Sequence, residues 1–150
     1  MPKSFFSFFD SRTFKVMTQF VKPYRIRFAD CDIAGIVFHP QVFCMTNALT
    51  EDFFREKLDL PFETMDEAGF IFPIVHIECD FMKPMKVGDE ILKVFEIERI
   101  GNSSLTVRIF FKKGDDVVFS CKETMVCMDL NTKRSIAIND DLRHRLEANL

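Results

Sequence analysis

Residues 28–40 read FADCDIAGIVFHP, in which Asp30 and Asp32 stand before a small-residue pair and the apolar triplet 36–38. Pro40 ends the stretch at a point where a helix can begin, because the N–H group that proline lacks is one that the first helical turn leaves unpaired. The segment therefore predicts an irregular, acid-bearing connection that leads directly into a helix.

The helix that follows is predicted to run from Pro40 to about Lys57. Apolar residues recur there at three- and four-residue spacing, which is typical of a helix with one buried face. Basic residues suit the negative end of the helix dipole, and Pro61 lies just past the expected end. The buried face requires a sheet to pack against, and consists of Val42, Met45, Leu49 and Phe53.

The rest of the chain supplies that sheet. Residues 18–28 alternate between apolar and polar side chains, as a half-buried strand does, and Pro23 indicates an edge or a bulge. Further strands are predicted over 71–81, 90–100, 104–111 and 116–128, with tight hairpins at Gly101-Asn102 and 113–116. A last short helix is expected from Asn139 or Asp140. The order of one strand, one helix and four strands predicts an α+β domain with an antiparallel sheet.

Composition indicates a single domain over 18–150, preceded by an N-terminal extension over 1–17. The 150 residues are 47% hydrophobic, which is enough for one core. With 19 Phe, one Tyr and no Trp, the core should hold large aromatic side chains that need no polar partner. Five cysteines without a CxxC pair favour reduced thiols, read as small core residues, and a cytoplasmic location.

Charge and hydropathy exclude several classes of partner. A net charge of -3 argues against broad binding to nucleic acid or anionic membranes, and no apolar run approaches the roughly 20 residues of a membrane span. The Phe-rich extension lacks the features of a signal peptide. It is interpreted as a tail that packs on the domain or a partner subunit, as a weak membrane-surface contact, or as residues ahead of a true start at Met17.

The stretch before the helix also contains the candidate chemistry. Backbone N–H groups at a helix start are unpaired and lie at the positive end of the dipole, so they can stabilise a developing oxyanion. Gly35 permits an unusual turn or the close approach of a ligand. An aspartate beside such a site could attack a carbonyl or deprotonate water. Alternatively, Asp30 and Asp32 only make the side-chain-to-backbone turns common before helices.

The same stretch resembles the signature of the 4-hydroxybenzoyl-CoA thioesterase family, in which Asp-x-Asp-x-x-Gly-(Ile/Val)-Val leads into a central helix. Residues 72–75 (FPIV) and 84–89 (PMKVGD) resemble the second strand of that family and the turn after it. The resemblance covers roughly residues 24–114. It implies a hotdog fold, an antiparallel sheet of five or six strands wrapped around one long central helix.

The resemblance further implies hydrolysis of an acyl-CoA thioester to free acid and CoA, without a cofactor or metal, between the subunits of a homodimer or homotetramer. It makes Asp32 the nucleophile or general base, the backbone N–H of His39 the polariser of the carbonyl, and Gly35 part of the catalytic loop. Ile33 and Gln41-Val42 replace residues that are frequent in the family at the border of the acyl pocket, so the acyl group stays open. The implied substrate- and CoA-binding residues are Phe72, Pro73, Ile74, Val75, Ser103 and Ser104.

Several alternatives remain at this point. The His39 imidazole could shuttle a proton or contact substrate, and an acyl carrier protein could replace CoA. The chain could instead be a non-catalytic acyl-CoA-binding protein, or a dehydratase or hydratase of acyl thioesters. Cys31 is a poor nucleophile because the acids on either side raise its pKa. No spacing of His and Cys residues indicates a metal site.

Overall fold

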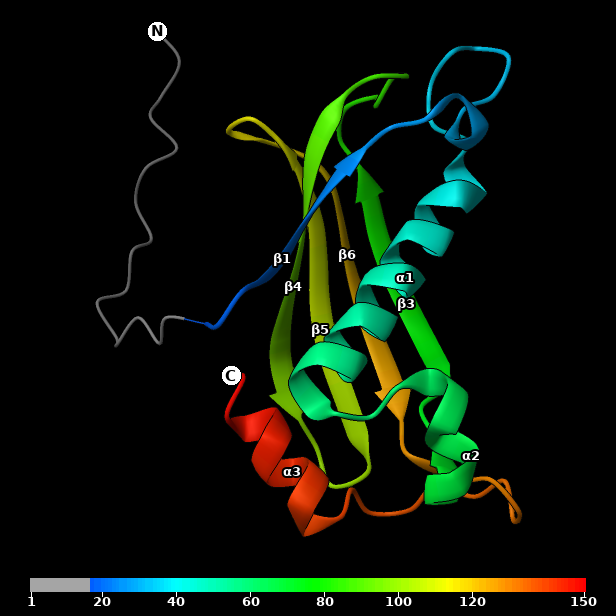
Figure 1. The fold of residues 1–150 in the computed structure, drawn as a ribbon, viewed down its shortest axis with the longest axis vertical. Coiled ribbons are helices and arrows are strands. Elements are labelled where there is room, and N and C mark those ends of the chain that lie inside the picture. The colour runs from blue at the N-terminus through cyan, green and yellow to red at the C-terminus, as the bar shows by residue number, and fades with distance from the viewer. Residues whose placement is uncertain (1–16) are drawn as a thin grey trace, which may run out of the picture.

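The computed structural model describes residues 17–150, so the predicted extension lies outside the described residues except for Met17. One antiparallel sheet, in the strand order β1-β4-β5-β6-β3, carries the long helix α1 (His39–Leu58) across one face (Figure 1). The predicted α+β architecture is thus confirmed. The strands are β1 (Phe20–Arg25), β3 (Ile74–Phe81), β4 (Glu90–Ile100), β5 (Ser104–Lys113) and β6 (Asp116–Val126).

The prediction of two continuous strands, over 71–81 and over 116–128, was wrong. The stretch 71–81 divides into β2 (Phe70–Ile71) and β3, and the stretch 116–128 divides into β6 and β7 (Met128–Asp129). The short strands β2 and β7 pair with each other in a separate two-stranded sheet. The change of sheet falls at Pro73, which has no N–H to donate to a ladder but accepts from the Val126 N–H at 3.1 Å.

Short helices complete the chain. The 3₁₀ helix η1 (Phe28–Asp30) precedes α1, while η2 (Phe62–Thr64) and α2 (Met65–Ala68) follow it. The last helix, α3 (Asp140–Glu147), begins as predicted, because the side chain of Asn139 accepts a hydrogen bond from the Leu142 N–H at 2.8 Å.

The core lies between α1 and the sheet and is built largely from phenylalanine. Phe54, Phe95, Phe111 and Phe119 are fully buried, and the rings of Phe53 and Phe95 stack with centroids 4.2 Å apart. The predicted buried face of α1 is confirmed in all four residues. The polar residues Thr46 and Thr50 are buried as well, which the sequence pattern did not indicate.

The cysteines are free thiols within residues 17–150, but they are not all core residues. Cys121 and Cys127 are buried, and Cys31 and Cys79 are half-buried. Cys44 is exposed, contrary to the prediction, because its position on α1 points away from the sheet-facing stripe. Among the described residues, none of the helices combines the length and the apolar character needed to cross a membrane.

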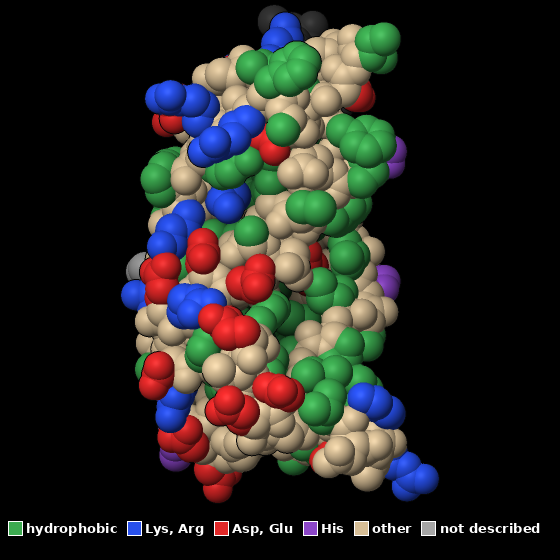
Figure 2. All heavy atoms as spheres, turned by 45° about the vertical axis from the view of Figure 1, so that its right-hand side comes forward, with side chains coloured by type: hydrophobic (Ala, Val, Ile, Leu, Met, Phe, Trp, Pro, Cys, Tyr) green, Lys and Arg blue, Asp and Glu red, His purple; other side chains and the backbone are tan. Residues whose placement is uncertain are grey.

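One edge of the sheet is unusually apolar. Strand β3 pairs with β6 on one side only, and its other edge is unpaired within residues 17–150. Hydrophobic side chains gather on this side of the molecule (Figure 2). The exposed apolar residues of β3 and the turn after it are Ile74, Val75, Ile77, Phe81 and Met82.

Candidate active site

Asp32 lies in a tight turn that the backbone closes on itself. The Asp32 N–H donates to the Ile36 carbonyl at 3.0 Å, and the Gly35 N–H donates back to the Asp32 carbonyl at 2.9 Å. Gly35 has a φ of 74°, a left-handed conformation that glycine adopts without strain. The Asp32 carboxylate accepts one bond, from the Ala34 N–H at 2.8 Å, and is otherwise exposed. It is therefore fixed in position and accessible.

Asp30 has the opposite environment, because its carboxylate is buried and accepts hydrogen bonds from three other residues. It accepts the Tyr24 hydroxyl at 2.9 Å, the Arg27 N–H at 2.7 Å and the Gln41 side-chain amide at 3.2 Å. Its backbone carbonyl accepts the N–H of Phe38 at 2.9 Å. Asp30 thus joins β1, the turn and the start of α1.

The residues alone did not separate the roles of these two acids, although the family resemblance assigned catalysis to Asp32. The available signal was Tyr24, the one tyrosine in a chain of 19 phenylalanines. A tyrosine hydroxyl on a half-buried strand calls for a polar partner.

The start of α1 presents an unpaired amide beside the acid. The side chain of the N-cap residue Phe38 makes no capping hydrogen bond, and Pro40 has no N–H. The Gln41 N–H donates to the Phe38 carbonyl at 2.8 Å, whereas the N–H of His39 finds no acceptor among residues 17–150. His39 is accordingly the residue whose backbone can receive a ligand oxygen at the positive end of the helix dipole.

Asp32 and His39 line the same pocket, which has a volume of about 300 Å³. The Val37 N–H donates to the Met85 carbonyl at 2.8 Å, and this bond fixes the acid-bearing turn against the loop after β3. The remaining walls are mainly apolar. They are formed by Ile36, Val37, Val42, Phe81, Met82, Lys83, Pro84 and Met85.

The other predicted binding residues lie outside this pocket. Phe72 is buried in the core against Phe54 and Phe70, whereas Ile74 and Val75 are exposed on β3. Ser103 and Ser104 are half-buried, Ser103 in the turn after β4 and Ser104 at the start of β5. The structure therefore brings together the predicted catalytic residues but not the predicted CoA-binding residues, whose roles stay predictions.

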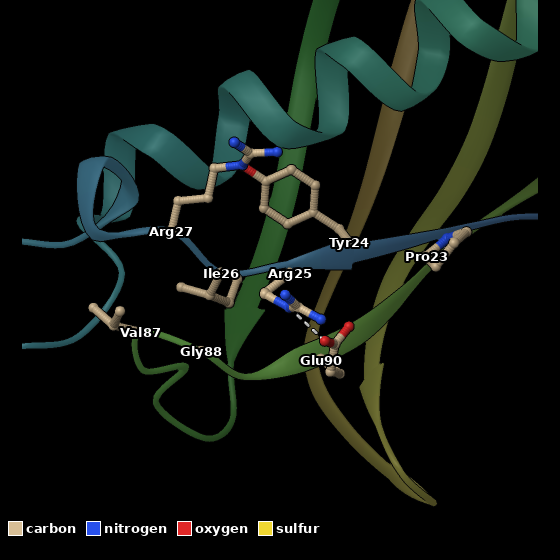
Figure 3. Close-up of a pocket in the computed structure, with 8 residues that line it drawn as sticks. All are labelled: Pro23, Tyr24, Arg25, Ile26, Arg27, Val87, Gly88 and Glu90. Atoms are coloured by element: carbon tan, nitrogen blue, oxygen red, sulfur yellow. Dashed lines mark hydrogen bonds and ion pairs between the residues drawn. The ribbon is translucent and has the colours of Figure 1, made fainter.

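A second hollow, of about 540 Å³, lies where β1 runs beside the start of β4 (Figure 3). Arg25 and Glu90 form an ion pair on one side of it, and the side chain of Arg27 lies near the ring of Tyr24 on the other. None of the predicted site residues lines this hollow, although it is larger than the pocket of Asp32. Its lining residues include the ion pair of Arg25 and Glu90 but no residue from the start of a helix.

Cys31 does not compete with Asp32 as a nucleophile. Burial, and then the adjacent charges of Asp30 and Asp32, raise the pKa of the Cys31 thiol. This direction confirms the expectation from the sequence. The thiol therefore stays protonated at neutral pH and is a poor nucleophile.

The chain is similar to known proteins over most of its length. The model of a family described as the thioesterase-like superfamily matches residues 26–146. A 1,4-dihydroxy-2-naphthoyl-CoA hydrolase of Nostoc punctiforme is 28% identical over 125 residues, covering 83% of this chain and 84% of the relative. A hydrolase of the same name from Prochlorococcus marinus is 29% identical over 137 residues, covering 83% and 86% of the two chains.

Solved structures share the fold. A gentisyl-coenzyme A thioesterase superposes with a TM-score of 0.74 at 27% identity, over 82% of this chain and 98% of that one. A 1,4-dihydroxy-2-naphthoyl-CoA thioesterase from Synechocystis gives a TM-score of 0.78 at 20% identity, over 85% and 95% of the two chains.

Proposed function

Since the chain belongs to the thioesterase-like superfamily, we propose that it hydrolyses an acyl-CoA thioester to a free acid and CoA. The observation that carries the proposal is the pairing of an exposed Asp32 carboxylate with an unpaired His39 amide at one pocket. The names of the relatives support it, because they describe hydrolases and thioesterases of aromatic acyl-CoA substrates.

In the proposed reaction the thioester carbonyl oxygen accepts the N–H of His39, so that the helix start stabilises the negative charge of the tetrahedral intermediate. The Asp32 carboxylate either attacks the carbonyl carbon or removes a proton from the attacking water. Attack expels CoA as a thiolate and leaves a mixed anhydride, which water then opens to the acid. In the other route, water that has lost a proton to Asp32 adds to the carbonyl carbon, and the tetrahedral intermediate then expels CoA as a thiolate to give the same products.

The test is a panel of short, long, branched and aromatic acyl-CoAs scored by release of free thiol, with Asp32→Ala as the control. We expect the wild-type protein to release thiol from at least one substrate and Asp32→Ala to release almost none. A non-catalytic acyl-CoA-binding protein would retain its ligand intact. A dehydratase or hydratase would change the acyl group and leave the thioester in place.

We further propose that a second copy of the chain covers the free edge of β3. An unpaired strand edge with exposed apolar side chains favours pairing with another strand, and monomers normally protect such an edge with charges, proline or a covering loop. Phe81 and Met82 belong both to this edge region and to the wall of the pocket. The second copy would therefore enclose the site of Asp32.

Light scattering after gel filtration should show a dimer or a tetramer. Val75→Lys places a charge on the free edge, so we expect it to shift the assembly toward monomer at micromolar concentration and to lower thiol release. Val21→Lys is the matched control, because Val21 is an exposed valine on the opposite edge strand β1. A monomeric wild-type protein would contradict the proposed assembly.

A further inference from the structure

The sheet has an apolar row on the face that points away from α1. The ring of Phe53 on α1 contacts the rings of Phe20 and Phe95, at centroid distances of 5.6 Å and 4.2 Å, so these two strand residues point toward the helix. Side chains alternate along a strand, and the next pair in the register, Val21 with Val94, therefore points to the opposite face. This opposite side of the sheet is its outer face.

The row extends across three neighbouring strands. Val94 of β4 lies between Val21 of β1 and Phe110 of β5. Two residues earlier on β4, Leu92 pairs with Pro23. Val94 is buried without belonging to the core beneath α1, whereas Val21 and Leu92 are 40% and 44% exposed. These five residues, the outer row, therefore present a free apolar surface among residues 17–150.

Polar side chains border the outer row at both ends. At one end Arg25 and Glu90 form an ion pair on the side of β1 that points away from α1 (Figure 3). At the other end the Gln19 side-chain amide donates to the Glu96 carboxylate at 2.6 Å. The outer row is thus a bounded apolar patch, which a short segment of chain is long enough to cover.

The first 16 residues of the sequence, which lie outside the described residues, have a composition that suits this patch. They contain five of the 19 phenylalanines, at positions 5, 6, 8, 9 and 14. Phenylalanine gains a large amount of free energy when its ring leaves water for an apolar surface. The same segment holds three basic residues and one acid, which are Lys3, Arg12, Lys15 and Asp10.

Charge favours this segment over a second copy of the domain as the occupant of the outer row. Three of the 20 basic and one of the 23 acidic residues lie in the segment, so residues 17–150 keep 17 basic and 22 acidic residues and a formal charge of -5. Stacking of two outer faces would bring two such domains together. The segment instead brings a formal charge of +2 to an acidic domain.

The segment also joins the domain beside the outer row. Met17 precedes the first residue of β1 by three positions, and Val21 is the second residue of that strand. Three strands at a spacing of about 4.8 Å are about 10 Å wide, whereas 16 extended residues reach about 50 Å. A short tether at this point gives the segment a high effective concentration at the outer row.

We propose that residues 1–16 dock on the outer face of the sheet of their own chain and cover the outer row with phenylalanine side chains. The occupant is this segment, held by its apolar rings and by the charge of the acidic domain. The site of Asp32 lies at the start of α1, so docking has no step in the proposed reaction.

Trypsin cleavage after Arg12 and Lys15 measures this docking, because a docked segment is cut only in proportion to the fraction that is released. Mass spectrometry of the full chain gives the rate. Leu92→Lys removes leucine contacts and places a positive charge in the outer row, so we expect it to raise the rate by on the order of tenfold. Thr124→Lys is the matched control on the outer face of β6, outside the row, and should keep the wild-type rate.

A tryptophan provides a second measurement that does not depend on proteolysis. The sequence has no Trp, so the fluorescence of Phe9→Trp reports on the segment alone. We expect emission at a shorter wavelength than in the unfolded chain and weak quenching by acrylamide. Adding Leu92→Lys to Phe9→Trp should move the emission to longer wavelength and strengthen the quenching.

Three results would overturn the proposal. The first is an equal cleavage rate, or an equal emission, with and without Leu92→Lys. The second is protection of the segment that increases with protein concentration, which would mean that a second copy covers the outer row. The third is a shift of the Phe9→Trp emission only after phosphatidylserine vesicles are added, which would mean that the segment binds a lipid surface.

Discussion

Asp32→Asn should lower kcat by on the order of 100-fold or more and leave the fold intact. The amide neither attacks a carbonyl nor takes a proton from water, but its oxygen can still accept the Ala34 N–H that the carboxylate accepts. KM should change far less than kcat, because the pocket walls remain. Steady-state thiol release and a thermal melt by circular dichroism measure the two effects.

The matched control for this variant is Asp129→Asn. Asp129 also accepts backbone N–H groups of the residues that follow it, at 3.0 Å from Asn131 and 2.7 Å from Thr132, but it lies outside the pocket. It should keep the wild-type kcat. Retention of more than a third of the wild-type kcat by Asp32→Asn would remove Asp32 from the reaction.

Asp30→Ala should destabilise the protein by about 3 kcal/mol. The change leaves the Tyr24 hydroxyl, the Arg27 N–H and the Gln41 amide without their acceptor in a part-buried site. Activity should fall too, because the turn that positions Asp32 loses its anchor. The midpoint of urea unfolding and the slope of the transition give the free energy.

Two comparisons distinguish this anchoring from a general sensitivity of the loop. Asp32→Ala should unfold close to the wild-type midpoint, because its exposed side chain accepts a single bond. Tyr24→Phe removes one donor and keeps Asp30, so it should cost about 1 kcal/mol. Equal midpoints for Asp30→Ala and Asp32→Ala would show that the buried hydrogen bonds contribute little.

The elements that the sequence predicted best are those with strong local signals. The predicted helix over 40–57 agrees with α1 because Pro40 and Pro61 bound an unbroken apolar stripe. The strand over 90–100 agrees with β4 for a related reason, since a hairpin signal follows at Gly101. The family resemblance, drawn from the motif around Asp32, is confirmed by the match to residues 26–146.

What the sequence did not reveal depends on partners that are distant along the chain. The separation of β2 from β3 reflects pairing with β7, more than 50 residues away, and Pro73 marks the break locally although the alternation continues through it. The burial of Asp30 depends on Tyr24 and Gln41 meeting from two different elements. Glu123 occupies an alternating strand position like its neighbours, so only the packing of α1 shows that it is enclosed.

The closed turn around Asp32 also affects which mutations the protein can accept during evolution. Backbone bonds between positions 32, 35 and 36 hold the acid, and none of them involves the side chain of Ile33, which is fully exposed. Mutations at position 33 can therefore alter what this loop contacts while the Asp32 carboxylate stays where it is. Substitution of Ile33 is therefore a route to a changed substrate preference that leaves the adjacent acid in place.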